Sequence, residues 1–269
     1  MRLQIKRLIS QTFFLLLANL GALRIKTGFC YPFFYCHGCP AASAGCPLGT
    51  IEHAVYRGKI GWMLLLYPLL FIATIGMVFG RAICGWACPI GLLQRVTYPI
   101  SQKRSIKKLS QKISPVLLRY ARFIKYLNLI LLVFLTPYFI GFMFTNICPV
   151  GFLTGTIPIL ALNYGQFVPN QFFYAALIIF ILFIILIVLS GRGWCKYFCP
   201  LGALLAPFNK ISLLHIEIEA DKCLHCNLCS NACPMGIDVP NMNRSPECIL
   251  CGRCIDACPQ NIIHFKVGT

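Results

Sequence analysis

The sequence predicts an α-helical membrane protein with four transmembrane helices arranged as two parallel repeats, followed by a small α+β domain. Three observations lead to this fold. Four stretches of the 269-residue chain are long and apolar, a Cys-Pro-apolar-Gly motif occurs four times, and eight cysteines are regularly spaced near the C-terminus. Hydrophobic residues make up 58% of the chain, which exceeds the usual share in a soluble domain. We expect membrane repeats at residues 1–110 and 111–210 and an end domain at 211–269.

Four apolar stretches are candidates for spans, because a helix needs about 20 apolar residues to cross a bilayer. The first is short, but Arg24 and Lys26 can snorkel at its end. A cleaved secretory signal is the alternative for this stretch, but no clean small-residue cleavage site follows it. Pro149–Leu162 is also apolar but is interrupted by Gly and Pro, so we expect a re-entrant or interfacial segment. The predicted spans are Leu8–Leu23, Ile60–Gly80, Phe123–Phe144 and Gln171–Ser190.

The net charge of +17 is unevenly distributed along the chain. Residues 1–216 contain 20 basic residues and one acidic residue, Glu52, whereas residues 217–269 contain 4 basic and 6 acidic residues. The basic residues bracket the apolar stretches, so contact with a membrane explains them and nucleic acid binding is not expected. Ten of them lie in residues 81–125, between the second and third spans. Positive loops stay in the cytoplasm, so we expect a multi-pass protein of the cytoplasmic membrane with both termini cytoplasmic.

The end domain contains the motif C-x2-C-x2-C-x3-C-P twice, which is the bacterial ferredoxin pattern for two [4Fe-4S] clusters. In this pattern the fourth cysteine of each copy binds the cluster of the other copy. Zinc sites are the alternative, but the x3-C-P endings argue against them. The sequence therefore predicts a dicluster ferredoxin domain and an electron-transfer role. The predicted ligands are Cys223, Cys226, Cys229 and Cys258 for cluster 1, and Cys248, Cys251, Cys254 and Cys233 for cluster 2.

The Cys-Pro-apolar-Gly motif indicates an internal repeat. It begins at Cys46, Cys88, Cys148 and Cys199, and the second and fourth copies carry another cysteine four residues upstream. Each half then contains a span, an outer Cys-Pro loop, a second span and an inner C-x3-C-P motif, so an axis along the membrane normal should relate the halves. Buried structural cysteines are the alternative. We expect a third iron–sulfur cluster at the repeat interface, bound by Cys84, Cys88, Cys195 and Cys199.

Five further cysteines belong to the outer face. Cys46 and Cys148 are repeat partners, and Cys36 and Cys39 would complete a quartet for a fourth cluster, with Cys30 as an alternate ligand. Disulfide bonds are the other interpretation, since an outer face can be oxidising. The order CHGC is not the C-x-x-C-H haem signature, so covalently bound haem is not expected.

Glu52 and His53 form the one acidic–imidazole pair near the outer face. Such a pair could accept protons released from a quinol. A solvated pair in a loop is the plainer interpretation and is preferred. No nucleotide or flavin motif is present, so we expect no substrate-turnover site in the chain alone.

Together, the four spans, the paired cysteines Cys84/Cys88 and Cys195/Cys199, and the eight cysteines at 223–258 resemble the NapH-type membrane polyferredoxins, which are related to NosR and CcoG. The resemblance implies electron transfer between the quinone pool and iron–sulfur or haem partners, as a subunit of a quinol dehydrogenase type of complex. It implies redox partners on one or both faces, either an iron–sulfur protein or a cytochrome.

The inner and outer cysteines are expected on opposite sides of a core about 30 Å thick, which is too wide for efficient single-step electron tunnelling. Crossing would then need a quinone between the repeats, a partner cofactor, or clusters set deep in the membrane. Two other functions are compatible with the sequence. The chain could be an assembly or metal-reduction factor, as the CcoG resemblance allows, or a redox sensor whose ferredoxin domain signals.

Overall fold

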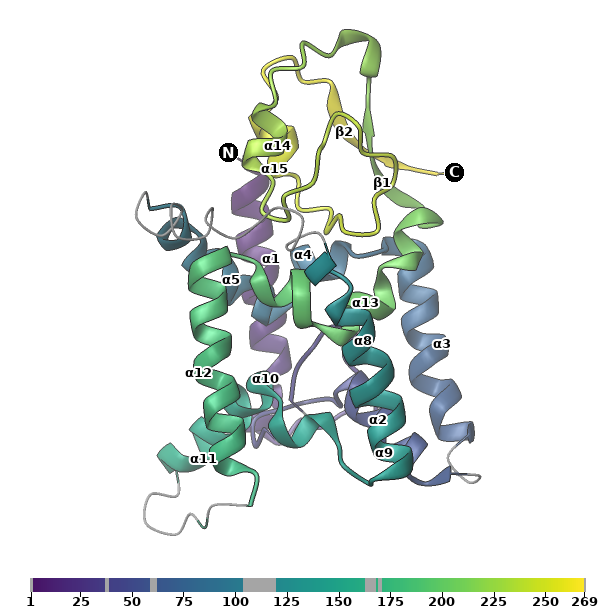
Figure 1. Cartoon of the computed structure of the whole chain (residues 1–269), viewed down its shortest axis with the longest axis vertical. Helices are drawn as coiled ribbons and strands as arrows, with labels where there is room; N and C mark the ends of the chain where they lie inside the picture. Colours follow the sequence, from purple (N-terminus) through teal and green to yellow (C-terminus); the bar gives the residue numbers. More distant parts are fainter. Residues whose placement is uncertain are drawn as a thin grey trace.

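The protein is an upright bundle of helices with a small domain on one end (Figure 1). The N-terminus of the chain lies at the same end of the bundle as the C-terminus, beside the small domain (Figure 1). The computed structural model describes residues 2–36, 39–58, 62–103, 120–162, 168 and 171–268.

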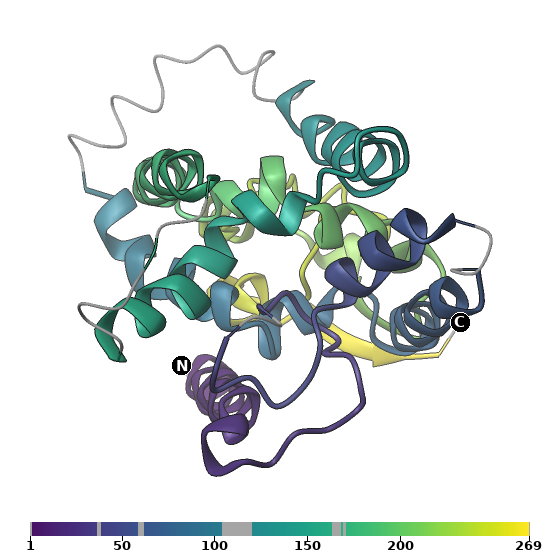
Figure 2. The same ribbon diagram turned by 90° about the horizontal axis from the view of Figure 1, so that it is seen from below.

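Four long helical segments form the frame of the bundle. They are α1 (Arg2–Ala18), α3 (Trp62–Phe79), the segment Ile124–Phe139, and α12 (Phe173–Ser190). Figure 2 shows them roughly end-on around the periphery. The third segment changes its hydrogen bonding along its length, because the π-helical η3 (Leu129–Leu135) separates α8 (Ile124–Asn128) from α9 (Thr136–Phe139).

Helix length distinguishes one of these segments from the others. Among the described residues, α12 is the one helix that is long and apolar enough to cross a membrane. Three apolar helices are shorter, at Met63–Phe79, Ile124–Phe139 and Pro149–Leu162. Helix α3 ends at Phe79, one residue before the end of its apolar stretch, where Gly80 takes a φ of 54°. Helix α12 ends at Ser190, the last residue of its apolar stretch.

Each of the four Cys-Pro motifs begins a helix. The cysteine is the N-cap residue with extended backbone, and the proline takes the first helical position, where its missing N–H costs nothing. The sequence motif is therefore a helix-start signal. The four helices are α2 (Pro47–Tyr56), α5 (Pro89–Ser101), α10 (Pro149–Gly151) and α13 (Pro200–Leu205).

The apolar stretch at Pro149–Leu162 is helical. After α10 it continues through the π-helical η5 (Phe152–Thr156) into α11 (Ile157–Leu162). It packs beside α12 at the end of the bundle away from the small domain (Figure 1).

Short segments complete the bundle. The inner upstream cysteines lie in α4 (Ala82–Trp86) and in the π-helical η6 (Trp194–Phe198). Single 3-10 turns join the other elements, at η1 (Leu20–Leu23), η4 (Phe144–Ile147), η7 (Pro207–Lys210) and η8 (Ala220–Lys222).

The small domain is built around a two-stranded antiparallel sheet. Strand β1 (Leu214–Ile218) pairs with β2 (Ile263–Val267), and Leu214 lies opposite Val267. Two one-turn helices, α14 (Leu228–Ala232) and α15 (Arg253–Ala257), pack against each other. Apolar side chains from the strands and connecting loops form a separate core, with Ile216, Val239, Leu250, Ile262 and Ile263 buried.

The aromatic segment Tyr31–Tyr35, between α1 and α2, is buried inside the bundle instead of lying on its surface. Phe33 and Phe34 are only 2% and 3% exposed. Figure 2 shows the chain after α1, in purple to dark blue, crossing beneath the middle of the bundle. The hydroxyl of Tyr31 anchors this segment, because it donates to the carbonyl of Ala18 at 2.7 Å and accepts from the backbone N–H groups of Ser43 and Ala44, each at 2.9 Å.

We predict that Tyr31→Phe destabilises the protein by about 1–3 kcal/mol, because the Ala44 N–H loses its acceptor and the Ser43 N–H keeps only the carbonyl of Ala18. Chemical unfolding of the purified protein in detergent measures this change. Tyr174→Phe removes the hydroxyl of an exposed tyrosine and is the matched control. Equal stability of both variants would contradict the anchoring role of Tyr31.

Candidate iron–sulfur sites

The small domain contains two pockets, and each is lined by one of the cysteine sets that the sequence groups together. The first pocket, of about 410 Å³, lies beside the sheet and is lined by Cys223, Cys226, Cys229 and Cys258. The second, of about 320 Å³, is lined by Cys233, Cys248, Cys251 and Cys254.

The two short helices of this domain explain why the fourth cysteines are exchanged. Cys229 lies in α14 and faces the first pocket, whereas Cys233 follows the helix and reaches the second. In the same way α15 carries Cys254 to the second pocket and ends at Cys258, which lines the first. Each helix therefore connects both pockets.

A third pocket, of about 310 Å³, lies inside the bundle. The sequence repeat brings two cysteines to it from each half of the chain. The rest of its lining is apolar, with Phe33, Phe34, Ile90, Trp194 and Leu201. The four cysteines are all buried, at Cys84, Cys88, Cys195 and Cys199.

Two buried arginines join the halves of the chain around this pocket. Arg81, three residues before Cys84, donates to the carbonyl oxygen of Cys195 at 3.4 Å. Arg192, three residues before Cys195, donates to the carbonyl oxygen of Cys84 at 3.3 Å. Both arginines are at most 1% exposed. The reciprocal contacts are those expected for two repeats related by an axis through the pocket, and the sequence analysis missed them although both arginines follow a glycine in the repeated string.

The glycine of each inner motif allows a close approach, within its own half at Gly91 and between the two halves at Gly202. A Cβ atom on Gly91 would lie 2.6 Å from the carbonyl oxygen of Cys84, and one on Gly202 would lie 3.0 Å from the guanidinium of Arg81. In addition, the Gly202 N–H donates to the sulfur of Cys199 at 3.4 Å. The N-terminus of α13 thus directs a donor at this sulfur, although burial outweighs it and raises the pKa of the Cys199 thiol above its ordinary value.

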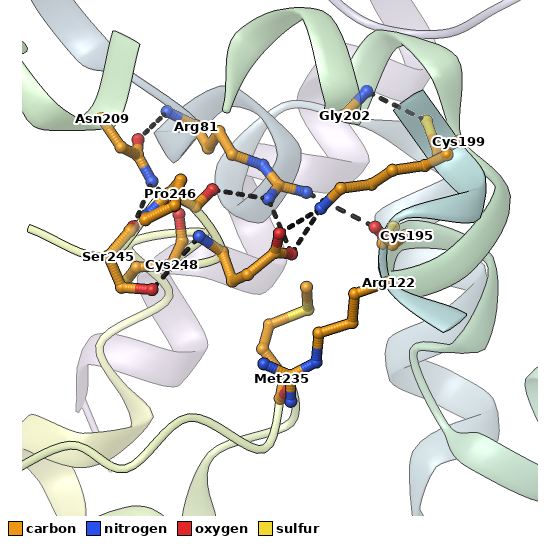
Figure 3. A network of polar contacts seen from close by, with 12 residues as sticks. Arg81, Arg122, Cys195, Cys199, Gly202, Asn209, Met235, Ser245, Pro246 and Cys248 are labelled. Carbon is orange, nitrogen blue, oxygen red and sulfur yellow. Dashed lines mark hydrogen bonds and ion pairs between the residues drawn. The ribbon is translucent and has the colours of Figure 1, made fainter. Parts of the chain in front are cut away.

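A buried ion-pair network attaches the small domain to the bundle beside this pocket. Glu247 pairs with Arg81 at 3.3 Å and with Lys125, and both cationic side chains are fully buried. Figure 3 shows Arg81 reaching toward Pro246 on one side and Cys195 on the other. Burial alone would raise the pKa of Glu247, but Arg81 and Lys125 outweigh it and hold this pKa below its ordinary value.

Further hydrogen bonds tie the same surfaces together. Asn209 donates to the carbonyl oxygens of Ser245 and Cys248, at 3.0 Å and 2.5 Å, and its own side-chain oxygen accepts from the Arg81 N–H (Figure 3). The indole of Trp86 donates to the carbonyl of Leu250 at 2.8 Å. The loop that lines the second pocket is therefore bonded directly to the segments that carry the inner cysteines.

Only some of the outer cysteines lie together. Cys36, Cys46 and Cys148 line a fourth pocket of about 220 Å³, together with Phe34 and Thr145. Cys39 is buried nearby but does not line this pocket, and the sulfur of Cys30 lies 3.4 Å from the hydroxyl of Thr50. All 17 cysteines are free thiols, so the disulfide interpretation is not met in this structure.

Phe34 borders both the inner and the outer cysteine pocket. A single aromatic side chain therefore lies between sites that the sequence analysis placed on opposite sides of a thick core. Of the three ways of crossing considered there, the arrangement matches cysteine sites set deep in the bundle. Sequence reasoning missed this because it treated residues 30–46 as an outer loop.

Glu52 lies in a helix, α2, and not in the solvated loop that was preferred from the sequence. Its side chain is fully buried, whereas His53 is exposed on another face of the helix. One carboxylate oxygen accepts from the hydroxyl and the N–H of Thr145, at 2.8 Å and 3.2 Å. The other oxygen is buried without a partner. Burial raises the pKa of Glu52 to about 7.

This raised pKa predicts that the protein loses stability as the pH rises. The folded state binds the Glu52 proton more tightly than the unfolded state, so the stabilisation is full below pH 4.5 and lost as the pH passes through 7. The total effect is about 3 kcal/mol. Thermal unfolding between pH 5 and 8 should show this slope in the wild type. Glu52→Gln keeps an acceptor for Thr145 and should remove the slope, and an unchanged slope in the variant would contradict the assignment.

The four pockets suit iron–sulfur clusters in the type of donor they present, because each is lined by at least three thiols and is otherwise mostly apolar. Within the described ranges, no group of three or more His, Cys, Asp or Glu is arranged to hold a single metal ion. A zinc ion draws four ligands to about 2.3 Å from one point, whereas each thiolate of a [4Fe-4S] cluster binds a different iron atom.

Comparison with known protein families supports iron–sulfur binding. A family described as "4Fe-4S binding domain" matches residues 60–107 and again residues 172–218. A family described as "4Fe-4S dicluster domain" matches residues 205–268. The first family therefore matches twice, and each match contains one inner C-x3-C-P motif. No solved structure matches the chain.

Several curated proteins are similar to this chain. MJ0750 of Methanocaldococcus jannaschii is 31% identical over 88% of this chain and 85% of its own length. The methylamine utilization ferredoxin-type protein MauN of Methylorubrum extorquens is 29% identical over 63% of this chain and 53% of its own length. The regulatory protein NosR of Pseudomonas aeruginosa is 27% identical over 68% of this chain and 25% of its own length. The chain therefore belongs to a family of ferredoxin-type 4Fe-4S proteins that includes MJ0750 of Methanocaldococcus jannaschii.

Proposed function

We propose that this chain is a membrane-embedded electron-transfer subunit that passes electrons between ferredoxin-type clusters on the cytoplasmic face and a quinone or a redox partner at the outer face. The succession of cysteine pockets carries this proposal. The loop that lines the second pocket of the small domain is bonded to the segments of the inner pocket, and Phe34 borders the inner and outer pockets.

The residues that would hold the clusters are the four cysteine sets described above. Bound at these positions, [4Fe-4S] clusters supply one-electron transfer. The chain contributes thiolate ligands, a helix N-terminal N–H that donates to the sulfur of Cys199, and an apolar lining of the inner pocket that keeps water from the ligands. For the outer set we propose Cys36, Cys46 and Cys148 with Cys39 as the fourth ligand.

A membrane location with four spans is supported by the outward faces of the long helices. These faces expose large apolar side chains that a soluble protein would cover. Ile9, Phe13 and Leu16 of α1 are 63%, 57% and 65% exposed, and α12 exposes Ile178 and Leu182 by 59% each. Similar side chains on the other two segments are Leu66 and Leu70 in α3 and Ile130 and Leu131 in η3. The basic residues near the small domain favour a cytoplasmic position for it and for both termini.

The outer end is where we propose an exchange of protons with a quinone. Glu52 is buried next to the outer pocket. Thr145 lines that pocket and donates a hydrogen bond to the Glu52 carboxylate. Its raised pKa, about 7, lets it accept and release a proton near neutral pH. His53, exposed one residue further on, would pass this proton to water. If oxidation of a quinol analogue by the purified protein is unchanged in Glu52→Ala and in His53→Ala, this role is excluded.

The proposed partners are those of a NapH-type polyferredoxin, namely redox subunits on one or both faces of a quinol dehydrogenase complex. The similarity to MauN and NosR, which covers about two thirds of this chain, supports redox partners of this kind. A stable complex with stoichiometric partners after purification from the membrane is the expected result.

Electron transfer across a sealed vesicle tests the proposal. The purified chain is placed in vesicles that contain ferricyanide, and dithionite is added outside. We expect ferricyanide to be reduced faster than in vesicles without protein. Cys46→Ala should abolish the crossing but leave the signals of the two clusters in the small domain.

Two outcomes would contradict the proposal. One is reduction in wild-type vesicles that is no faster than in vesicles without protein. The other is crossing in Cys46→Ala at the wild-type rate, since the outer pocket would then take no part.

A further inference from the structure

A fifth pocket, separate from the cysteine pockets, lies where the bundle meets the small domain. It has a volume of about 180 Å³ and is lined by four arginines, Arg7, Arg95, Arg192 and Arg253, together with Gln94 and Tyr98. They come from α1, α5, the turn after α12, and α15. No carboxylate is found among the described residues that line it. Such a concentration of cationic groups favours a bound anion, and the Cys251 thiolate of the second cluster site offsets only part of the charge of Arg7 and Arg95.

Backbone carbonyls fix two of these guanidinium groups and leave part of each unpaired. Arg7 is 1% exposed and donates through Nε to the carbonyl of Gly85 at 2.6 Å. Arg95 donates through Nη2 to the carbonyl of Gln4 at 2.6 Å. The remaining terminal nitrogens, Nη2 of Arg7 and Nη1 of Arg95, are buried without a partner. Among the described residues, these two donors therefore have no hydrogen-bond acceptor.

The other two arginines add positive charge to the pocket. The guanidinium of Arg253 lies over the ring of Tyr98, 4.2 Å from its centre, which fixes the plane of the fork. Arg192 donates to the carbonyls of Cys84 and Gly91. Burial, and then the neighbouring Arg253 and Arg192, lowers the pKa of Arg95, as expected where like charges are held together.

We propose that this pocket binds a phosphate group. Guanidinium forks match phosphate oxygens in pairs, and several of them together favour a group of more than one negative charge. The position beside the membrane surface makes two sources chemically equivalent, which are inorganic phosphate and the headgroup of an anionic phospholipid.

The pocket is connected to the inner cysteine pocket. Gln94 lines the phosphate pocket, and its side-chain nitrogen lies 3.1 Å from the sulfur of Cys195. Its side-chain oxygen is buried without a partner. An anion bound by the arginines around Gln94 will therefore change the environment of the inner cysteine pocket.

Binding measurements on the purified protein with its clusters test the proposal. Inorganic phosphate is titrated by calorimetry, and native mass spectrometry measures retained phosphatidylglycerol. We expect one phosphate group per chain. Arg95→Gln removes a charge and a free donor and should weaken binding about tenfold or more. Lys103→Gln removes one charge from an exposed residue after α5, outside the pocket, and should bind as the wild type does.

The two sources give different results that both support the pocket. Retained phosphatidylglycerol that phosphate displaces identifies a lipid headgroup, and phosphate binding without retained lipid identifies the free anion. An unchanged cluster content in Arg95→Gln shows that this variant is folded. The proposal is overturned if the wild type binds neither probe in a one-to-one ratio, or if Arg95→Gln and Lys103→Gln bind equally well.

Discussion

Glu247→Gln is expected to destabilise the protein by about 3–5 kcal/mol, because it leaves two buried cations without their counter-ion. Arg81 and Lys125 are both fully buried, and Glu247 is the carboxylate that they share. The small domain should then separate from the bundle before the rest unfolds. Limited proteolysis between residues 205 and 215, together with thermal unfolding, measures this change.

The same substitution at an exposed ion pair is the control. Glu217 pairs with Lys266 at 2.7 Å on the surface of the sheet, with both side chains substantially exposed. Glu217→Gln should leave stability nearly unchanged, since solvent screens exposed pairs. The lowered pKa of Glu247 adds a pH signature, because its stabilisation is present above pH 4.5 and is lost as the pH falls further. If both variants unfold alike, the buried network does not hold the domain.

Cys195→Ser is expected to remove about four iron atoms from each chain and to leave the other sites filled. Cys195 is buried in the inner pocket, where a hydroxyl is a much weaker iron ligand than a thiolate. The electron crossing should be lost with it. Iron and sulfide analysis and low-temperature EPR measure the loss.

Cys30→Ser is the matched control, because the thiol of Cys30 lies against Thr50 and does not line a cysteine pocket. Its iron content should equal that of the wild type. Full iron content in Cys195→Ser would exclude the inner site, and a loss in Cys30→Ser would assign Cys30 to the outer one.

Spacing and the internal repeat predict the cysteine sets that line the two pockets of the small domain and the inner pocket, whereas the outer set lies together only in part. Short intervals such as that from Cys223 to Cys226 bring thiols together locally, and the repeat pairs Cys84 with Cys195 across the chain. The long helices could also be predicted, because an apolar stretch is a feature of local composition.

Contacts between distant segments could not be predicted. Phe34 looks like any aromatic residue in a loop, and only the fold places it between two pockets. Glu52 was expected in solvent because an isolated carboxylate is rarely buried, and its burial depends on Thr145, which lies 93 residues away. The pairing of Arg81 with Glu247 likewise spans 166 residues and has no local signal.

The ends of the helices also could not be predicted from the sequence pattern. The apolar stretch Ile60–Gly80 extends one residue beyond the end of α3 at Phe79, and the stretch after Ile124 contains a π-helical segment that hydropathy does not reveal. Both differences arise from backbone hydrogen bonding, which depends on packing against neighbouring helices.

The central claim is that four cysteine sites connect the two ends of this chain. Iron and acid-labile sulfide analysis of the purified full chain, with low-temperature EPR of the reduced protein, tests it most directly. We predict about 16 iron atoms per chain and four interacting cluster signals. About eight iron atoms, with signals from the small domain alone, would contradict the claim.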